Sequence, residues 1–293
     1  MLYLEISDLC NANCIFCAYQ FDSRKKGFLK TESYEKALRE YHALGGRVVS
    51  LSPMTGEIFT NKNLLEILDF IDSLGFDTVY SYTNLLQIHK FNMDRLLNTG
   101  LTQLSISTAP LECDVYTKMF GVGRKQYEQL LRNFKAFLTA VKKAQNPKLQ
   151  SVDIAFRTDR TFEALTQLDD YKTWVQPYLS SRVTFSNVIS EFDSWMGQIK
   201  PDSLMPGMSI KSAEFSKPIP CERMYNVHVR ANGDIRLCGC RIDYRKEKDA
   251  FKVGHIEQDT IVETFNSKKA KNLVNTFRTG NLLEECKDCA WYT

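Results

Sequence analysis

The sequence predicts an α/β protein whose residues 1–190 form a partial (β/α)6 barrel. Six short apolar runs, rich in β-branched residues, alternate with helix-like segments in this part of the chain. Repeated βα units of this kind form parallel sheets with right-handed crossovers and buried strands. A group of cysteines directly follows the first run, and such barrels place their chemistry at the carboxyl ends of the strands.

The apolar runs predict strands at residues 2–6, 47–52, 78–82, 103–107, 152–157 and 182–188. The intervening segments predict helices at residues 31–44, 63–74, 94–98, 127–144 and 162–178. In the first helix, apolar residues such as Tyr34 and Leu38 recur with a period near 3.6, and Thr31 is a suitable cap. Asn63 caps the second helix in the same way, and Gly75 ends it.

The character of the chain changes near residue 190. Residues 191–220 are irregular and rich in proline, so we expect a linker that covers part of the active site. Asn232-Gly233 then separates two strand-like runs at 225–230 and 235–237, which indicates a β-hairpin. Helices are expected at 259–265 and 268–277. The chain therefore divides into a barrel (1–190), a linker (191–220) and a small C-terminal domain of hairpin and helices (221–293).

The 293-residue chain has 43% hydrophobic and 25% charged residues, as an ordinary globular protein does. Its formal net charge of +3 is too small to indicate nucleic acid or an anionic membrane as a partner. Glu5 and Asp8 lie where a signal peptide needs basic and apolar residues, and no apolar run approaches the roughly 18 residues of a membrane span. The chain has nine cysteines, which are mostly grouped, and grouped cysteines in such a chain indicate metal or redox chemistry in a reducing compartment, so we expect a cytoplasmic protein.

Three cysteines, Cys10, Cys14 and Cys17, form the pattern C-x3-C-x2-C after the first predicted strand. Three thiolates on one loop suit one [4Fe–4S] cluster that is held by three of its four irons. The fourth iron is then open to a small molecule. A structural cysteine cluster or a zinc knuckle is the alternative, but zinc needs a fourth ligand, and neither Asp8 nor Asn11 is a good one.

This pattern resembles the radical S-adenosylmethionine (SAM) superfamily, and Phe16 before the third cysteine fits the family's common motif. Thr55-Gly56-Glu57, after the second strand, resembles the Gly-Gly-Glu-Pro motif that holds the methionine amino group of SAM. A bound ammonium needs carbonyl and carboxylate oxygens, and a glycine lets the backbone approach it. Thr55 replaces the first glycine and Ile58 replaces the proline, so an ordinary turn is the alternative.

Three further resemblances lie at the ends of the third, fourth and fifth predicted strands. Thr83-Asn84 resembles the family's Thr-Asn-Gly, with Leu85 in place of the glycine. Ser107 stands where the family places a polar residue on the SAM ribose, and the Arg157 guanidinium is suited to pair with the SAM carboxylate. The alternative for each is a polar residue that is satisfied locally at a strand end.

A second group of cysteines lies in the last quarter of the chain. The expected ligands of one zinc ion or one iron–sulfur cluster are Cys221, Cys238, Cys286 and Cys289. The pattern resembles the SPASM/twitch extensions of radical SAM enzymes, and its cysteine count fits the shorter form with one auxiliary [4Fe–4S] cluster. By this resemblance Cys238 is the ligand and Cys240 is a spare thiol, which either packs as a small apolar group or donates a hydrogen atom to a substrate radical. The reverse assignment, with Cys240 as ligand, stays open.

The resemblance implies an enzyme that reductively cleaves SAM to methionine and a 5′-deoxyadenosyl radical, which abstracts hydrogen from a substrate. Relatives with one auxiliary cluster commonly oxidise a carbinol, so we expect oxidation or epimerisation of a small molecule such as a sugar or aminocyclitol. A flavodoxin or ferredoxin is the expected reductant. A peptide maturase that forms a thioether or carbon–carbon crosslink is the alternative, and a non-enzymatic zinc or cluster protein is a third hypothesis.

Three residues outside these motifs complete the predictions. Asp193 is a candidate substrate contact, and Trp195 is interpreted as a hydrophobic anchor for the linker. Cys113 belongs to neither cysteine pattern and is expected to take no part in the chemistry.

Overall fold

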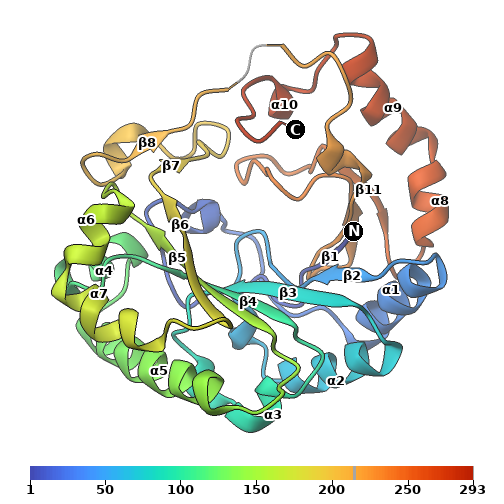
Figure 1. Ribbon diagram of the computed structural model, residues 1–293. Helices are drawn as coiled ribbons and strands as arrows, with labels where there is room; N and C mark the ends of the chain where they lie inside the picture. Colours follow the sequence, from blue (N-terminus) through green and yellow to red (C-terminus); the bar gives the residue numbers. More distant parts are fainter. Residues whose placement is uncertain (214–215, 293) are drawn as a thin grey trace.

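The barrel sheet contains six parallel strands that lie side by side in the order of the sequence (Figure 1). The computed structural model describes residues 1–213 and 216–292. The strands are β1 (Leu2–Leu4), β2 (Val48–Ser50), β3 (Thr78–Thr83), β4 (Gln103–Thr108), β5 (Ser151–Arg157) and β6 (Val183–Ile189). Each strand begins and ends within two residues of the bounds that the sequence predicted for it. The α/β class and the partial barrel are therefore confirmed.

Helices cover the outer face of this sheet (Figure 1). They are α1 (Thr31–Ala43), α2 (Leu64–Leu74), α3 (Met93–Leu97), α4 (Cys113–Phe120), α5 (Arg124–Lys143), α6 (Phe162–Gln167) and α7 (Asp169–Trp174). The prediction of one helix over residues 162–178 is wrong, because Leu168 adopts an extended conformation that separates α6 from α7. Asp169 and Asp170 stabilise the new helix start, since acidic side chains interact favourably with a helix N-terminus. Helix α4 was not predicted.

Successive strand residues face opposite sides of the sheet. Leu2 and Leu4 of β1, like Leu104 and Ile106 of β4, are almost fully buried beneath the helices. The residues between them are partly exposed and face the barrel interior. Most of these interior residues are polar or aromatic with a polar end: Tyr3, Tyr80, Tyr82, Gln103, Ser105, Ser107, Asp153 and Arg157. The barrel interior is therefore suited to a polar occupant.

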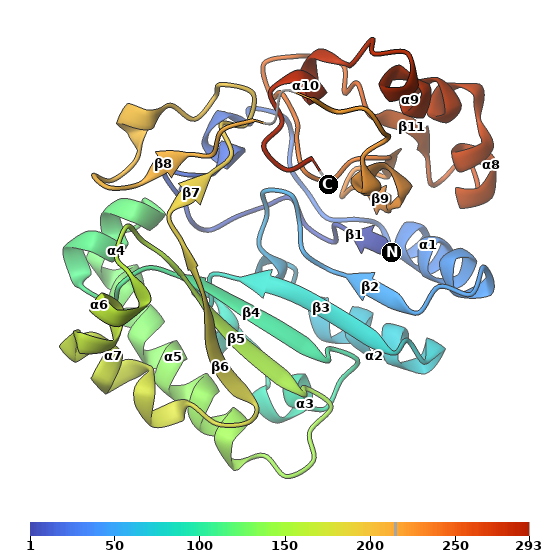
Figure 2. The same ribbon diagram turned by 45° about the horizontal axis from the view of Figure 1, so that its top comes forward.

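The predicted hairpin is present and extends the barrel sheet. Strand β9 (Val227–Val229) pairs in parallel with β1, and β10 (Asp234–Arg236) pairs antiparallel with β9. A further strand that was not predicted, β11 (Lys252–His255), completes a nine-stranded sheet among the described residues. Helices α8 (Ile261–Asn266), α9 (Lys268–Arg278) and α10 (Glu284–Lys287) lie beyond the hairpin (Figure 2). The C-terminal region thus packs directly against the first barrel strand.

The expected linker contains two short strands, β7 (Glu191–Phe192) and β8 (Ser209–Ile210), which pair in parallel. Residues 214 and 215 of this linker, and residue 293, lie outside the described residues. Short 3-10 helices occupy several connections: η1 (Ala18–Phe21), η2 (Ile58–Thr60), η3 (Ile88–Lys90), η4 (Gln176–Tyr178), η5 (Pro201–Ser203) and η6 (Glu222–Tyr225). None of the described helices is both long and apolar enough to cross a membrane.

Candidate active site

The loop that carries Cys10, Cys14 and Cys17, here called the thiol triad, is held against the end of α4. The backbone N–H groups of Asn13 and Ile15 donate to the carbonyls of Phe120 and Met119, at 2.9 and 3.0 Å. Gly121 follows with φ +59°, and a Cβ there would collide with the Asn13 carbonyl. Helix α4 therefore fixes the shape of the loop, and it does so through backbone contacts that leave no motif in the sequence.

The three thiols of the triad lie close enough to influence one another. Burial raises the pKa of Cys10 to about 12, with the Glu57 carboxylate as the next cause. Burial also raises the pKa of Cys17 to about 11, and it raises that of Cys14 strongly, with the charges of the other two thiols adding to the effect. Thiolates in this loop therefore need a positively charged partner, and an iron–sulfur cluster supplies one. Among the described residues, no group of three or more His, Cys, Asp or Glu side chains is arranged to hold a single metal ion.

Glu57 is a buried carboxylate that follows β2 and faces the end of β3. One carboxylate oxygen accepts hydrogen bonds from Phe59 N–H at 3.1 Å and Thr83 Oγ1 at 2.8 Å, and the other accepts from Asn84 N–H at 2.7 Å. Burial nevertheless raises the pKa of Glu57 to about 7. No cation within the described parts of the chain forms an ion pair with it. The residue therefore fits a bound ammonium group, for which an acceptor position remains.

The two residues before Glu57 have different surroundings. Gly56 packs against the cysteine loop so closely that a Cβ would collide with the Ser7 carbonyl, and it would lie 3.0 Å from Asp8 Cα. Thr55 shares a 2.7 Å hydrogen bond with the Tyr244 hydroxyl of the C-terminal region. The structure thus brings Glu57 toward the triad, uses Gly56 for close packing, and turns the Thr55 hydroxyl toward Tyr244.

Asn84 lies beside the triad. Its amide nitrogen donates to Asn11 Oδ1 at 2.9 Å and lies 3.8 Å from Cys10 Sγ. Leu85, which stands in place of the family's glycine, adopts φ +63°, a conformation that favours glycine. The strain is offset by complete burial of Leu85 and by Asn133 Nδ2, which donates to the Leu85 carbonyl at 2.8 Å.

Arg157, at the end of β5, lies on the other side of the triad. Its Nε donates to Ser107 Oγ at 2.9 Å, and its guanidinium lies 5.4 Å from the centre of the Phe16 ring. Phe16 also stacks on Phe192 of the linker, at 5.1 Å between ring centres. Burial lowers the pKa of Arg157, and no carboxylate within the described residues pairs with it. This guanidinium therefore fits a bound carboxylate.

Tyr116 of α4 is a site residue that sequence reasoning missed. Its side chain is fully buried, and its hydroxyl has no hydrogen-bond partner among the described residues. Burial raises its pKa, followed by the charges of Cys14, Glu57 and Cys10, so the hydroxyl lies near all three. A buried phenol without a partner is unfavourable, which indicates a partner in the loaded site. No sequence signal was available, because α4 itself was not predicted.

The four expected auxiliary ligands, here called the auxiliary set, also converge. Cys221, Cys238 and Cys286 are buried in one apolar cluster, and the charges of the other three thiols, Cys289 among them, raise the pKa of Cys286 after burial. Cys240 lies beside Cys238, whose sulfur accepts a hydrogen bond from the Cys240 N–H at 3.4 Å. A hydrogen bond between the two thiols lowers the pKa of Cys238, with the charge of Arg236 adding to the effect, and the same hydrogen bond together with burial raises the pKa of Cys240. Cys238 is buried in the same apolar cluster as Cys221 and Cys286, whereas Cys240 is partly buried and only packs against that cluster, which favours Cys238 as the ligand.

Two buried cations, one from the linker and one from the segment after the hairpin, bind the loop that contains Cys286 and Cys289, here called the auxiliary loop. Lys217 Nζ donates to the carbonyls of Cys286 and Cys289, at 2.6 and 2.9 Å. Arg241 binds Asp288 at 2.6 Å and lies 3.3 Å from Asp193 Oδ1. Asp193 therefore has a structural partner, although its second oxygen has none among the described residues.

The other two residues singled out from the sequence lie elsewhere. Trp195 packs partly buried against the apolar core, as expected of an anchor, and has φ +47°. Cys113 begins α4, outside both cysteine groups.

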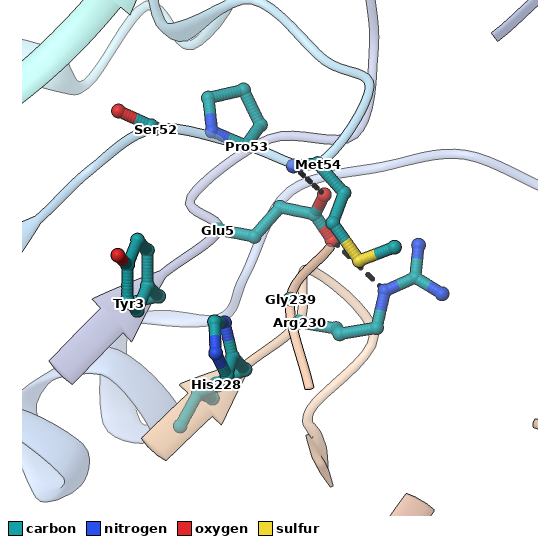
Figure 3. A pocket seen from close by; sticks show the side chains of 9 residues that line it. Tyr3, Glu5, Ser52, Pro53, Met54, His228, Arg230 and Gly239 are labelled. Atoms are coloured by element: carbon teal, nitrogen blue, oxygen red, sulfur yellow. Dashed lines mark hydrogen bonds and ion pairs between the residues drawn. The ribbon is translucent and has the colours of Figure 1, made fainter. Parts of the chain in front are cut away.

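A cavity of about 150 Å³ lies beside β1, where the ends of β2 and β9 flank it (Figure 3). Its lining comes from the ends of β1, β2 and β9: Tyr3, Glu5, Ser52, Pro53, Met54, His228, Val229, Arg230 and Gly239. Met54 directly precedes the Thr55-Gly56-Glu57 motif, and Gly239 lies between Cys238 and Cys240. In the sequence, residues that line the cavity are therefore direct neighbours of residues assigned to both sites.

Polar atoms of this cavity lack partners. Ser52 Oγ and His228 Nε2 are buried and form no hydrogen bond with described residues. The His228 ring stacks on Tyr3 at 4.3 Å, and a Cβ on Gly239 would collide with it. Burial, followed by the charge of Arg236, holds the pKa of His228 well below its usual value, so the ring is neutral. By contrast, Glu5 accepts from Met54 N–H and pairs with Arg230 at 3.1 Å.

The comparisons with known proteins agree with this geometry. The model of the radical SAM superfamily matches residues 4–164, which is more than half of the chain. The chain belongs to the radical SAM superfamily. A model of an iron–sulfur cluster-binding domain matches residues 221–290. This radical SAM enzyme therefore uses a [4Fe–4S] cluster that binds SAM, and it carries an auxiliary iron–sulfur cluster of the SPASM type.

Individual relatives of this radical SAM enzyme are distant. A probable GTP 3′,8-cyclase of Methanothermobacter thermautotrophicus is 27% identical over 132 residues, which are 45% of this chain and 41% of the relative. The structure of BtrN in complex with AdoMet and 2-DOIA matches with a TM-score of 0.56 and 13% identity, over 99% of this chain and 92% of that one. Streptococcus suis SuiB bound to the precursor peptide SuiA matches with a TM-score of 0.67 and 14% identity, over 100% and 71%. At these identities the two structures establish the fold.

Proposed function

We propose that this radical SAM enzyme oxidises or epimerises a small polyhydroxylated molecule, such as a sugar or aminocyclitol. The observation that carries the proposal is the small cavity lined by Met54, which precedes the Glu57 motif, and by Gly239, which lies between Cys238 and Cys240, together with the partnerless Ser52 and His228 atoms. Each of these buried atoms lacks a hydrogen-bond partner, which costs free energy, and we propose substrate hydroxyls as the missing partners. BtrN, solved with 2-DOIA, offers a precedent of similar fold.

The residues around the triad divide the work of binding SAM. The triad thiolates hold the cluster, Glu57 accepts the methionine ammonium, and Arg157 pairs with the carboxylate while Ser107 orients its guanidinium. Asn84 fixes the cysteine loop through Asn11. When bound, the cluster and SAM supply one-electron chemistry that ends in abstraction of a hydrogen atom from the substrate.

The auxiliary set is proposed to hold a [4Fe–4S] cluster that exchanges an electron with the substrate. Four protein ligands leave no open iron, so a role in electron transfer or structure follows rather than substrate binding. We also propose the division of the chain into residues 1–190, 191–220 and 221–293, and a cytoplasmic location, which the nine unpaired cysteines support.

A peptide maturase is the second candidate, and the fold similarity to SuiB favours it. The cavity argues against it, because about 150 Å³ accommodates a sugar-sized ring more readily than a peptide segment. GTP is a third substrate to test, in view of the curated relatives that are named GTP 3′,8-cyclases.

The test is anaerobic incubation with SAM and dithionite, first alone and then with aminocyclitols, sugars, GTP or candidate peptides. Release of 5′-deoxyadenosine and methionine is expected, and a true substrate should accelerate it. Oxidation yields a carbonyl product, whereas epimerisation in D2O yields a product of unchanged oxidation level with deuterium at the inverted carbon. Acceleration by a peptide or GTP, with none by polyols, would refute the proposed substrate class.

A further inference from the structure

A basic, hollowed surface lies over the auxiliary set, on α9 and η6. Lys268, Lys271 and Arg278 are exposed and recur at intervals of three and seven residues, which places them on one face of α9. Helix α9 contains no acidic residue, and none of the three cations forms an ion pair within the described parts of the chain. A positive stripe therefore follows the helix.

The hollow beside this stripe has a volume of about 450 Å³. Its lining includes Lys271 and Arg278 at the rim, with Met224, Leu237 and Ala270 among the apolar residues, and it includes no acidic residue. These three apolar residues belong to the cluster in which the auxiliary set is buried. Leu237 directly precedes the ligand Cys238, so a partner seated in the hollow lies next to the auxiliary cluster.

We infer that this surface docks a small acidic electron-transfer protein, which exchanges one electron with the auxiliary cluster. The inference rests on the proposed electron-transfer role of the auxiliary set. In each event the auxiliary cluster is oxidised by one electron and the oxidised partner is reduced by one. Opposite charges steer such encounters and raise their rates, and the apolar hollow supplies the contact area.

Positive charge alone does not identify the site. Helix α5 carries six Lys or Arg residues against one Glu, but it lies across the molecule from α9 in both views (Figures 1 and 2). It covers the outer face of the barrel, away from the auxiliary set. What distinguishes α9 is that its cations border an apolar hollow whose lining also buries the cluster ligands.

The test compares two charge reversals in the cluster-loaded enzyme. One variant carries Lys268→Glu, Lys271→Glu and Arg278→Glu on α9. The matched control carries Lys125→Glu, Lys135→Glu and Lys143→Glu on α5, three exposed residues that give the same change in charge. Dithionite-reduced enzyme, freed of excess reductant, is mixed with an oxidised acidic flavodoxin, and flavin reduction is followed by stopped flow at low and physiological salt.

We expect the α9 variant to react at least about tenfold more slowly than wild type at low salt and to lose most of the salt dependence. The α5 control should stay within about twofold of wild type, since its charges lie far from the docking surface. An α9 variant as fast as wild type, or equal slowing in both variants, would overturn the inference.

A milder variant guards against misfolding. Lys268→Gln, Lys271→Gln and Arg278→Gln should give an intermediate rate, with the iron content and visible spectrum of wild type. If the α9 charge-reversal variant loses iron, the Gln variant replaces it in the test. A rate of flavodoxin reduction equal to that of wild type would then refute the docking surface. Release of 5′-deoxyadenosine with dithionite should remain unchanged in every variant. If the wild-type enzyme itself released none, the proposed function would be refuted, and not the docking surface.

Discussion

The two cysteine sites differ in how the charges beside them are paired. Next to the triad, neither the Glu57 carboxylate nor the Arg157 guanidinium forms an ion pair with a described residue. Next to the auxiliary set, Arg236 binds Asp249 at 2.9 Å, Arg241 binds Asp288, and Lys217 donates to three backbone carbonyls. The triad has unpaired charges of both signs beside it, whereas Arg236, Arg241 and Lys217 beside the auxiliary set each have a protein partner.

This difference separates a ligand-binding site from a closed one. Buried charges without partners are unfavourable, so the surroundings of the triad are complementary to a ligand with an ammonium and a carboxylate, such as the methionine end of SAM. Beside the auxiliary set, Arg236 and Arg241 are paired with carboxylates and Lys217 with backbone carbonyls, so these three cations are not available to a ligand. The following predictions test this contrast.

The largest effect is expected when the triad is removed. The Cys10→Ala/Cys14→Ala/Cys17→Ala variant should release no 5′-deoxyadenosine, because SAM is bound and cleaved at the open iron of that cluster. It should retain the auxiliary cluster, so its iron content should fall to about half of the roughly eight irons expected for wild type. Iron analysis and chromatography of SAM products check both outcomes.

The same experiment can contradict the assignment of the auxiliary set. Iron near four in wild type, accompanied by one equivalent of zinc, would make the C-terminal site a zinc site. Cleavage of SAM by the triple variant would show that the triad is not the SAM site.

The second prediction removes one of the free charges. Glu57→Ala should weaken SAM binding by about 10- to 150-fold, which corresponds to the roughly 1.5–3 kcal/mol of a charged hydrogen bond. Both clusters should remain, because Glu57 is not a ligand. Equilibrium binding of SAM to the reconstituted variant measures the effect.

Thr55→Val is the matched control. Its hydroxyl bonds to Tyr244 rather than to the SAM site, so this variant should lose stability while its SAM affinity stays close to that of wild type. Equal loss of affinity in both variants would mean that Thr55-Gly56-Glu57 acts as a turn and not through the Glu57 charge.

The sequence predicts the triad and the parallel strands for physical reasons. A cluster needs its ligands on one short loop, so their spacing survives as a local pattern. Glu57 is predicted by the resemblance of Thr55-Gly56-Glu57 to the family motif, and its place after β2 supports this because parallel strands bring their carboxyl ends to one edge. Leu85 departs from the family motif, which has glycine at this position. It adopts the positive φ that favours glycine, and its burial and the hydrogen bond from Asn133 stabilise that conformation.

The residues that were not predicted depend on long-range contacts. His228 faces the cavity because β9 pairs with β1, which places it opposite Tyr3. Tyr116 reaches the triad from α4, a helix of eight residues whose apolar period is too short to recognise. Lys217 donates a hydrogen bond to the carbonyl of Cys286, which lies about seventy residues later in the sequence. No local pattern encodes these pairings.

The third prediction concerns the pH dependence of SAM binding. Glu57 has a pKa of about 7, and its ionised form is the one that accepts an ammonium. Below this pH a proton must leave before SAM binds, so the affinity should fall by up to about tenfold per pH unit. Above a pH of about 8 it should fall again as the α-amino group of SAM loses its proton. Equilibrium binding from about pH 5.5 to about pH 9, roughly 1.5 units below the first pKa and roughly 1 unit above the second, measures both limbs.

Glu57→Gln isolates the acidic limb. The amide has the same size and does not titrate, so the variant should bind SAM more weakly and lose the dependence below pH 7. It should keep the decline above pH 8, which belongs to the ligand. A wild-type acidic limb in this variant would assign the titration to another group.

The smallest change in iron is expected for Cys240→Ala. Cys238 is buried with Cys221 and Cys286, whereas Cys240 only packs against that cluster, so we take Cys238 as the ligand and expect the variant to retain the full iron content. Loss of about half the iron would reverse the two assignments.

The product then distinguishes the two reactions that the closed site permits. If Cys240→Ala cleaves SAM but yields an altered or aborted product, Cys240 donates the hydrogen atom that epimerisation requires. If the product is unchanged, the donor role is excluded and oxidation is favoured, because oxidation passes an electron to the auxiliary cluster and needs no returning hydrogen. Cys113→Ala is the control: this cysteine lies at the start of α4, outside both sites, and its variant should match wild type in iron and product. A loss in both variants would indicate a general effect of removing a thiol rather than a role for Cys240.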